Sequence, residues 1–216
     1  MKRINTSRYA DYGKYRKREK MVSVLKNYGI RDRRVLDAFL TIPRHFFLPE
    51  GSEELAYRDQ PAGIGFGQTI SQPYIIALML ESLRLEPHHR VLEIGSGCGY
   101  VIALLSLLVR EVYGIELENV LAEKSRKTLK QLNIQNAEVI CGNGWDGYPA
   151  KAPYDAILLS AAPEKLPEKL LTQLKPNGRL ILPVGKFAQL LELYEKKNGE
   201  WQKKIITEVR FVPLRK

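Results

Sequence analysis

The sequence predicts an α/β protein built on a doubly wound, mostly parallel sheet with an antiparallel C-terminal edge and a small N-terminal helical segment. Two patterns support this prediction. Apolar, strand-like runs alternate with helix-like runs from Arg90 to Leu182, which indicates a parallel sheet with helices on both faces. Near the C-terminus, Asn198-Gly199 separates two β-prone runs, and Asn-Gly in that setting is a strong signal for a hairpin.

The chain before the alternation is predicted to be helical with two loops. Apolar residues at helical spacing indicate two short helices within residues 21–42. Residues 43–51 are predicted to form a loop. Residues 61–73, PAGIGFGQTISQP, form a second, glycine-rich loop that precedes a helix through residues 75–83.

Within the alternation, a short apolar run bounded by turn residues predicts a buried strand, and helical periodicity predicts a helix. The strands are predicted at 90–94, 111–115, 137–140, 154–159 and 179–182, the helices at 100–109, 121–132 and 167–174, and the hairpin arms at 190–194 and 203–212. The last parallel strand is placed directly behind the turn Asn177-Gly178.

Length and charge predict one main domain preceded by a basic arm. The 216 residues are 44% hydrophobic, which is enough for one core of useful size. Residues 1–20 hold eight basic and two acidic residues, a net +6 of the +10 carried by the chain. We therefore predict a basic N-terminal arm, 1–20, and a single domain, 21–216, which comprises a substrate-side helical and loop segment (21–72), a cofactor-binding core (73–185) and a C-terminal hairpin (186–216).

The arm is the part of the sequence that would attract a polyanion. Its charge, with Tyr9, Tyr12 and Tyr15 available for stacking, fits RNA as a partner. A solvated, partly helical arm explains the same residues, because charge runs usually face water. Since the remainder of the chain is only mildly basic, nucleic acid is not the expected partner.

Composition predicts a cytoplasmic protein without a membrane segment or a metal, and we expect a monomer, although the sequence does not reveal the oligomeric state. No run approaches the roughly 18 apolar residues of a membrane-spanning helix, and the N-terminus is basic where a signal peptide would be apolar. Cys98 and Cys141 lack the spacing of a zinc site or a disulfide framework. His45, His88 and His89 have no partners at ligand spacing.

The most informative local motif is a glycine-rich turn between a strand and a helix. The stretch VLEIGSGCGY places Gly95, Gly97 and Gly99 at alternate positions. Glycine permits a tight turn and a close ligand approach, both of which a Cβ would block. Glu116 ends the next predicted strand, where a carboxylate can accept hydrogen bonds from both hydroxyls of a ribose. The pattern therefore predicts a cofactor that contains a nucleoside.

Three cofactor classes compete for this turn. A phosphate-binding loop for ATP ends in Gly-Lys-Ser/Thr, whereas this loop ends in Gly99-Tyr100. A dinucleotide fingerprint reads G-x-G-x-x-G, but the spacing here is G-x-G-x-G with Glu93 two residues before it. A carboxylate there would repel a pyrophosphate and could face the ammonium and sulfonium groups of S-adenosylmethionine. We favour S-adenosylmethionine; the alternative is that Glu93 is a surface residue and the glycines serve only packing.

Longer stretches resemble known families. VLEIGSGCGY is similar to the first motif of class I methyltransferases, and four further stretches resemble protein L-isoaspartate O-methyltransferases: IGFGQTISQPYIIA (64–77), PYDAILLSAA (153–162), LKPNGRLILPVG (174–185) and RFVPL (210–214). The similarity extends from about Met21 onward, and GQTIS is the part peculiar to that family. It implies a Rossmann-like methyltransferase sheet and a protein repair reaction: transfer of a methyl group from S-adenosylmethionine, which leaves S-adenosylhomocysteine, to the α-carboxylate of L-isoaspartyl residues in damaged proteins and peptides.

The resemblance also assigns site residues, with Ser71 as the active-site hydroxyl. The cofactor would contact Gln68, Thr69, Ile70, Glu93, Gly95, Ser96, Gly97, Gly99, Glu116, Leu117, Asn143 and Gly144, and the substrate would contact Ile64, Gly65, Thr69, Ser71, Val212 and Pro213. A substrate carboxylate is ionised at neutral pH, so Ser71 and Thr69 would orient it without a general base. The alternative is that Ser71 only caps the helix that starts near Pro73.

Two stretches near the site leave questions open. Asn143 stands where the family typically has an aspartate that accepts a hydrogen bond from the adenine amino group; an amide oxygen can accept the same bond, and Asp146 is a nearby alternative. Residues 210–213 would pair with an extended substrate backbone, although an ordinary edge strand stopped by proline explains them equally. Because the chain ends at Lys216, we expect no tail over the cofactor.

Two other functions stay open on the sequence alone. A methyltransferase for RNA or a small molecule would use the same cofactor site and the basic arm, although the chain lacks an Asn/Asp-Pro-Pro-Tyr signature and neither cysteine lies in an obvious catalytic loop. A binding module that keeps the cofactor but has lost catalysis is suggested by Asn143 and the same arm.

Overall fold

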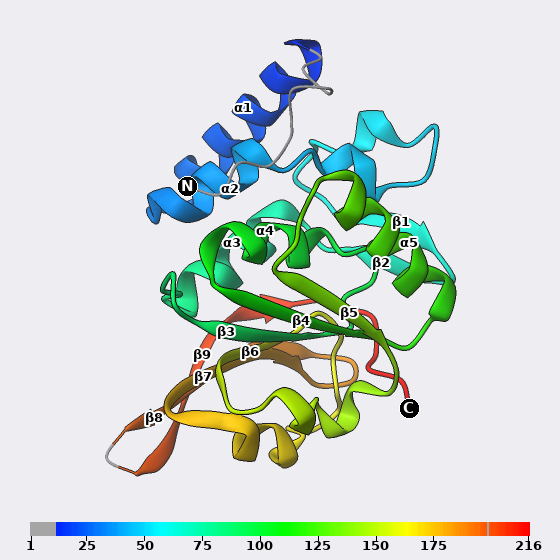
Figure 1. Cartoon of the computed structure of the whole chain (residues 1–216). Helices are drawn as coiled ribbons and strands as arrows, with labels where there is room; N and C mark the ends of the chain where they lie inside the picture. The colour runs from blue at the N-terminus through cyan, green and yellow to red at the C-terminus, as the bar shows by residue number, and fades with distance from the viewer. Residues whose placement is uncertain (1–11, 198) are drawn as a thin grey trace.

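The structure, a computed structural model, describes residues 12–197 and 199–216. Residues 1–11 of the predicted arm and Asn198 of the predicted hairpin turn lie outside the described residues. Helices lie on one side of a large sheet and short helical turns on the other (Figure 1). Within the described part of the chain, no helix is both long and apolar enough to cross a membrane.

The sheet has seven strands in the order β5-β4-β3-β6-β7-β8-β9. The first five in this order pair in parallel, and β7, β8 and β9 pair antiparallel. The predicted fold class is therefore confirmed. The bounds are β3 (Arg90–Ile94), β4 (Glu111–Glu116), β5 (Ala137–Cys141), β6 (Tyr154–Leu159), β7 (Leu174–Val184), β8 (Gln189–Lys197) and β9 (Glu200–Val209).

The helices and the remaining short elements precede or connect these strands. The helices are α1 (Tyr12–Asn27), α2 (Arg33–Thr41), α3 (Pro73–Ser82), α4 (Tyr100–Leu108) and α5 (Asn119–Gln131). The 3-10 turns are η2 (Arg44–Phe47), η3 (Glu53–Leu55), η4 (Gly144–Asp146), η5 (Pro149–Lys151) and η6 (Glu168–Gln173), and a separate hairpin consists of β1 (Ala62–Gly65) and β2 (Gln68–Ile70).

Both faces of the central strands are buried, so apolar side chains predominate on both faces of these strands. Along β3, Val91 packs into the core formed with α1–α5, while Leu92 packs into a second core on the opposite face. Leu158 and Leu159 of β6 divide in the same way. This two-residue periodicity follows from the alternation of side chains along a strand.

The second face is covered by 3-10 turns where a helix was predicted. The helix predicted at 167–174 is present as the six-residue 3-10 helix η6 and is not an α-helix, and β7 begins at Leu174. Pro176 disfavours helical geometry at Lys175, so a longer helix has no room before the strand. The predicted start of that strand behind Asn177-Gly178 was wrong, since these residues lie within β7, beside an irregularity in its pairing with β6.

Three N-terminal segments also differ from their predictions. Residues 61–73, predicted as a loop, contain the β1–β2 hairpin, whose antiparallel register pairs Gly65 with Gln68. Residues 43–51, predicted as a loop, contain η2. Helix α1 runs through the predicted boundary at residue 20, and the buried Arg18 donates Nη1 to the carbonyl oxygen of Thr41 at 2.9 Å. Residues 12–20 are therefore part of a helix that packs on α2.

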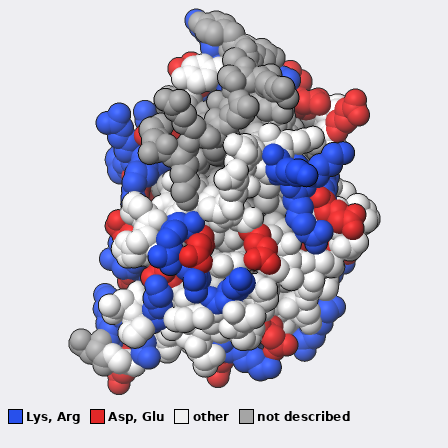
Figure 2. Space-filling model, viewed as in Figure 1, with Lys and Arg blue, Asp and Glu red and all other residues white. Residues whose placement is uncertain are grey.

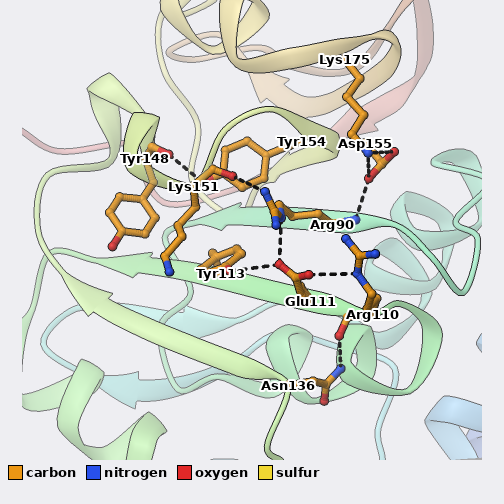
Figure 3. Close-up of polar contacts among 10 residues, drawn as sticks. All are labelled: Arg90, Arg110, Glu111, Tyr113, Asn136, Tyr148, Lys151, Tyr154, Asp155 and Lys175. Carbon is orange, nitrogen blue, oxygen red and sulfur yellow. Dashed lines mark hydrogen bonds and ion pairs between the residues drawn. The ribbon is translucent and has the colours of Figure 1, made fainter.

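Charged and polar side chains tie together the amino ends of β3, β4 and β6 (Figure 3). The Nε of Arg90 donates to Glu111 Oε2 at 2.8 Å, and its backbone amide donates to Asp155 Oδ2 at 2.7 Å. Lys175 Nζ lies 2.8 Å from Asp155 Oδ1. This network fixes the strands at the end opposite to their carboxyl termini, which remain available for a site.

The outer side of β5 is an edge of the sheet. Arg126 on α5 reaches this edge, and its Nε donates to the carbonyl oxygen of Val139 at 3.0 Å. The neighbouring residues Asn136 and Gly142 bond toward β4 instead. Arg126 therefore occupies an acceptor that the strand would otherwise offer to another strand.

Candidate active site

A cleft opens at the carboxyl ends of the parallel strands, where the chain order reverses. The chain passes from β3 to β4 and β5 on one side and returns to β6 on the other, and ligands of open α/β sheets bind at such switch points. The β1–β2 hairpin and residues 212–215 line the same cleft. Three segments far apart in sequence thus meet around it.

The floor of the cleft is the glycine-rich turn after β3. Gly95, Gly97 and Gly99 have φ values of 76°, 54° and 85°, a left-handed region that favours glycine. The amides of Gly95 and Ser96 donate to the carbonyl oxygen of Ile115 at 2.8 and 3.0 Å. A Cβ on Gly97 would lie 3.2 Å from Ile64 Cδ1 on the hairpin. The absence of side chains therefore leaves the space that the cleft occupies.

Glu116 at the end of β4 lines the cleft and is 5% exposed. Its Oε2 accepts from the amide of Gly97 at 2.6 Å, and its Oε1 accepts from the amide of Glu118 at 2.9 Å. A carboxylate has about four acceptor positions, so both oxygens keep capacity for ligand hydroxyls. The sequence prediction of an acid at this strand end agrees with its position.

Glu93 is buried beside the turn, so the alternative that it is a surface residue was wrong. Its Oε1 accepts from the Ser160 hydroxyl at 2.6 Å, whereas Oε2 is buried without a partner among the described residues. Burial raises the pKa of Glu93 to about 8, the charge of Glu116 adds to the rise, and the hydrogen bond from Ser160 opposes it. A cation close to Oε2 would favour ionisation of this carboxyl. Glu93 does not itself line the cleft.

Ser71 lies between the hairpin and α3 and is half-buried. The N-cap of α3 is Gln72, which makes no side-chain cap hydrogen bond, and the amide of Tyr74 donates instead to Asp59 Oδ1 at 2.9 Å. The capping alternative for Ser71 is therefore not supported. Thr69, two residues earlier, lines the cleft, while Ser71 is set back from it.

The C-terminal segment lines the cleft with residues 212–215. Ala162 donates its amide to the Val212 carbonyl oxygen and accepts from the Leu214 amide, each at 2.8 Å. Arg215 pairs with Glu118 at 2.7 Å. We call residues 212–215 the C-terminal strap. It connects the segment behind β6 with the segment behind β4.

The strap also limits the predicted pairing of residues 210–213 with a substrate backbone. Strand β9 ends at Val209, and Pro213 forms an isolated bridge with Ala162. The amide and carbonyl of Phe211 are bonded to the side chain of Gln189. Because these backbone groups have partners within the chain, residues 210–213 are not a free sheet edge, although Val212 and Pro213 line the cleft.

The side chain of Asn143 forms a hydrogen bond within its own turn. Its Oδ1 accepts from the amide of Trp145 at 3.0 Å as the cap of η4, and its side chain is outside the cleft lining. Asp146, the alternative acceptor, pairs with Lys169 at 2.6 Å. Gly142 and Gly144 line the cleft on either side of Asn143. The cap occupies one of the two lone pairs of Asn143 Oδ1, so this oxygen keeps capacity for a second donor.

The cleft brings together ten of the residues singled out from the sequence. These are Ile64, Gln68, Thr69, Gly95, Gly97, Glu116, Leu117, Gly144, Val212 and Pro213. The other predicted site residues lie outside the lining: Gly65, Ile70, Ser71, Glu93, Ser96, Gly99 and Asn143.

Sequence reasoning missed several lining residues. Ser160 and Ala161 follow β6, which pairs directly with β3. The rule that ligands bind at the carboxyl ends of adjacent parallel strands would have found them. Leu214 and Arg215 carry no such signal, because only the fold brings the strap to the cleft. Among the described residues, no group of three or more His, Cys, Asp or Glu side chains is placed to hold a metal ion.

Comparison with known proteins decides the family. The family described as protein-L-isoaspartate(D-aspartate) O-methyltransferase matches residues 16–216. The chain belongs to this family. Protein-L-isoaspartate O-methyltransferases from Roseiflexus sp. and Dictyoglomus turgidum are 46% and 44% identical to it; the first alignment covers 91% of both chains, and the second covers 95% of this chain and 94% of the relative.

Solved structures of the family share the fold. One protein-L-isoaspartate O-methyltransferase superposes with a TM-score of 0.82 at 33% identity, over 91% of this chain and 65% of that one. A Plasmodium falciparum protein described as a member of this family, in complex with S-adenosyl-L-homocysteine, gives a TM-score of 0.80 at 30% identity and covers 91% of this chain and 97% of that one. The structural similarity thus covers 91% of this chain in both superpositions.

Proposed function

We propose that this family member is a protein repair methyltransferase, which transfers a methyl group from S-adenosylmethionine to the α-carboxylate of L-isoaspartyl residues in damaged proteins and peptides. One observation carries the proposal: Gln68 and Thr69 of the GQTIS segment line the same cleft as Gly97 and Glu116 of the glycine-rich turn. The segment peculiar to the family and a nucleoside-type cradle therefore share one space.

The residues present fit S-adenosylmethionine. Any Cβ on Gly95 or Gly97 would project into atoms at the cleft, 3.3 Å from Ala161 Cβ and 3.2 Å from Ile64 Cδ1 respectively. Glu116 supplies a carboxylate for the ribose hydroxyls, and the unpartnered Oε2 of Glu93 suits a nearby cation. Apolar side chains of Ile94, Ile115 and Leu117 line the cleft and suit the face of a base. The predicted cofactor contacts remain our proposal residue by residue.

When bound, S-adenosylmethionine would supply a methyl group from a positively charged sulfur to the acceptor oxygen, and the electron pair of the broken carbon–sulfur bond would stay on sulfur. Opposite charges disappear in this step, which makes exclusion of water and alignment more important than proton transfer. Ser71 and Thr69 would donate hydrogen bonds that orient one carboxylate oxygen. Ile64 and Leu214 border the cleft with apolar surface and help to exclude water.

A labelled-methyl assay tests the proposal. We expect transfer to an isoaspartyl peptide and none above background to its aspartyl twin or to bulk RNA. Transfer to RNA alone would favour an RNA methyltransferase, and cofactor binding without transfer would favour a binding module. A purified protein that does not bind S-adenosylmethionine would contradict the whole interpretation.

Two substitutions separate the acceptor side from the cofactor side. Ser71→Ala should lower turnover and leave cofactor affinity nearly unchanged, because its hydroxyl orients the acceptor. Glu116→Ala should weaken cofactor binding by about 1–3 kcal/mol in calorimetry, because the ribose hydroxyls lose a charged acceptor. An unchanged rate for Ser71→Ala, or unchanged affinity for Glu116→Ala, removes the corresponding role.

We also propose that the chain acts in the cytoplasm as a monomer and without a nucleic-acid partner. Among the described residues on the face shown in Figure 2, basic and acidic side chains are interspersed. They do not form the continuous basic track that nucleic-acid binding would favour. Light scattering of the purified protein should give the molar mass of a monomer. Addition of RNA should leave this mass unchanged.

A further inference from the structure

Arg44 is a fully buried cation next to the acceptor side of the site. It begins η2, and its side chain is 0% exposed. Its Nη1 donates to the carbonyl oxygen of Ser71 at 3.0 Å, and its Nη2 donates to that of Gln60 at 3.4 Å. The guanidinium carbon lies 5.2 Å from the centroid of the Tyr100 ring. Two carbonyls and one aromatic face thus surround the charge.

No carboxylate forms an ion pair with Arg44 within the part of the chain that the structure describes. Asp59 lies near enough to influence its charge, but its carboxylate accepts from Gln72 Nε2 at 2.7 Å and from the Tyr74 amide at 2.9 Å. Burial of an unpaired guanidinium costs several kcal/mol, and it lowers the pKa of Arg44. Since a methionine would fill the same space without that cost, the charge requires an explanation.

The contacts of Arg44 and Asp59 converge on one short segment. Arg44 fixes the carbonyl of Ser71, and Asp59 fixes the side chain of Gln72 and the amide of Tyr74. The segment that carries Ser71 is thereby held from two sides as it enters α3. Its hydroxyl takes its direction from a backbone that these bonds define.

We propose that Arg44 is a positioning residue for the acceptor, which fixes Ser71 through its main-chain carbonyl and holds a buried positive charge beside that carbonyl, on the residue whose hydroxyl would bind the isoaspartyl carboxylate. The inference rests on the proposed role of Ser71. A cation without an ion-pair partner is screened less in a low-dielectric interior than in water. The acceptor carboxylate would therefore be attracted as an ion.

The two effects of Arg44 act on different kinetic constants. The acceptor loses negative charge as the new bond forms, so the positive charge stabilises the bound carboxylate more than the transition state and acts mainly on KM. The hydrogen bond to the Ser71 carbonyl governs alignment and acts mainly on kcat. This split would not arise if Arg44 served only to fill space.

Three matched variants of the full chain separate these effects, with an isoaspartyl peptide as substrate. Arg44→Gln keeps a donor without the charge and should raise KM about 10-fold with a smaller change in kcat. Arg44→Lys keeps the charge but loses the planar fork and should lower kcat about 10-fold with a smaller change in KM. Arg44→Met loses both and should lower kcat/KM by about 100-fold, while cofactor affinity measured by calorimetry changes less than about 2-fold in all three.

The double variant Arg44→Lys with Ser71→Ala gives an independent readout that does not depend on Arg44→Met folding. Because Arg44→Lys acts on kcat through Ser71, we expect kcat of the double variant to match that of Ser71→Ala. Three results would overturn the inference while the proposed function stands. In the first, the kcat losses of the two single variants multiply in the double variant. In the others, KM and kcat change equally in all Arg44 variants, or cofactor affinity falls in parallel with activity. A wild-type protein that leaves the isoaspartyl peptide unmethylated overturns the proposed function and this inference with it.

Discussion

Two glycine-rich turns border the same cleft, and they are built in different ways. In the turn Gly95–Gly99, an added Cβ would meet protein atoms: Ala161 Cβ at 3.3 Å from Gly95 and Ser125 Cβ at 3.1 Å from Gly99. In the hairpin turn Gly65–Gly67, an added Cβ on either glycine would have nothing within 4 Å. The first turn needs glycine for space and for conformation, and the second needs it for conformation alone.

The difference indicates separate tasks on the two sides of the cleft. The proposed cofactor side is a packed cradle whose shape is fixed by its neighbours, whereas the proposed acceptor side is an open hairpin defined by its own backbone. A fixed cradle suits one invariant cofactor, and an open hairpin suits protein substrates of varied sequence.

Gly99→Ala should destabilise the protein most. The residue has a φ of 85°, and the new methyl group would collide with the side chain of Ser125, which is fully buried on α5. Overpacking and left-handed strain together should lower the free energy of unfolding by about 2–5 kcal/mol in urea denaturation. Gly67→Ala is the matched control, because its φ of 68° carries strain without a collision, and it should cost about 1 kcal/mol. Equal losses for the two variants would contradict the contrast.

Glu93→Gln tests the buried carboxyl beside the packed turn through the pH dependence of stability. The folded pKa is raised from 4.5 to about 8, so the wild-type protein holds a proton that the unfolded chain releases. Its contribution to stability is complete below about pH 4.5 and is lost as the pH rises to about 8. The glutamine keeps an acceptor for Ser160 and does not titrate. Denaturation between pH 5 and 8 should therefore show a flatter curve for the variant, and parallel curves would refute the raised pKa.

Phe66→Asn should have the smallest effect on stability. Phe66 has a φ of 55° at the tip of the hairpin and is 54% exposed. Asparagine tolerates this conformation better in a two-residue hairpin loop, so the variant should gain about 0.5–1 kcal/mol in urea denaturation. If the exposed ring contacts peptide substrates, KM for an isoaspartyl peptide should rise while cofactor affinity is unchanged. A loss of stability would show that contacts of the Phe66 ring stabilise the hairpin by more than its backbone conformation costs.

Local and long-range features of the site differ in how well the sequence alone predicts them. The glycine-rich turn and Glu116 were found because each is a local signal at the end of a strand, and the parallel sheet was found because its strands are apolar on both faces. Arg44 was missed because its surroundings come from three separate segments, and nothing local marks a buried arginine as unpaired. The strap was missed for the same reason, since its partners Ala162 and Glu118 are distant in sequence.

Competition between local and tertiary preferences explains the remaining errors. The apolar periodicity around η6 is helical, but Pro176 and the register of β7 with β6 decide its geometry. The hairpin at 62–70 was predicted as a loop because its glycines weaken strand propensity, although pairing between two short runs is enough to order it.

The contact of Arg126 with Val139 has a consequence for handling the protein at high concentration. An unguarded outer strand can template fibre-like association between copies, and natural proteins often block it with a long cationic side chain. Arg126 blocks one acceptor on β5 directly at 3.0 Å. Replacement of this one surface arginine would leave the methyl-transfer cleft untouched and still shorten the time for which a concentrated sample stays free of aggregates.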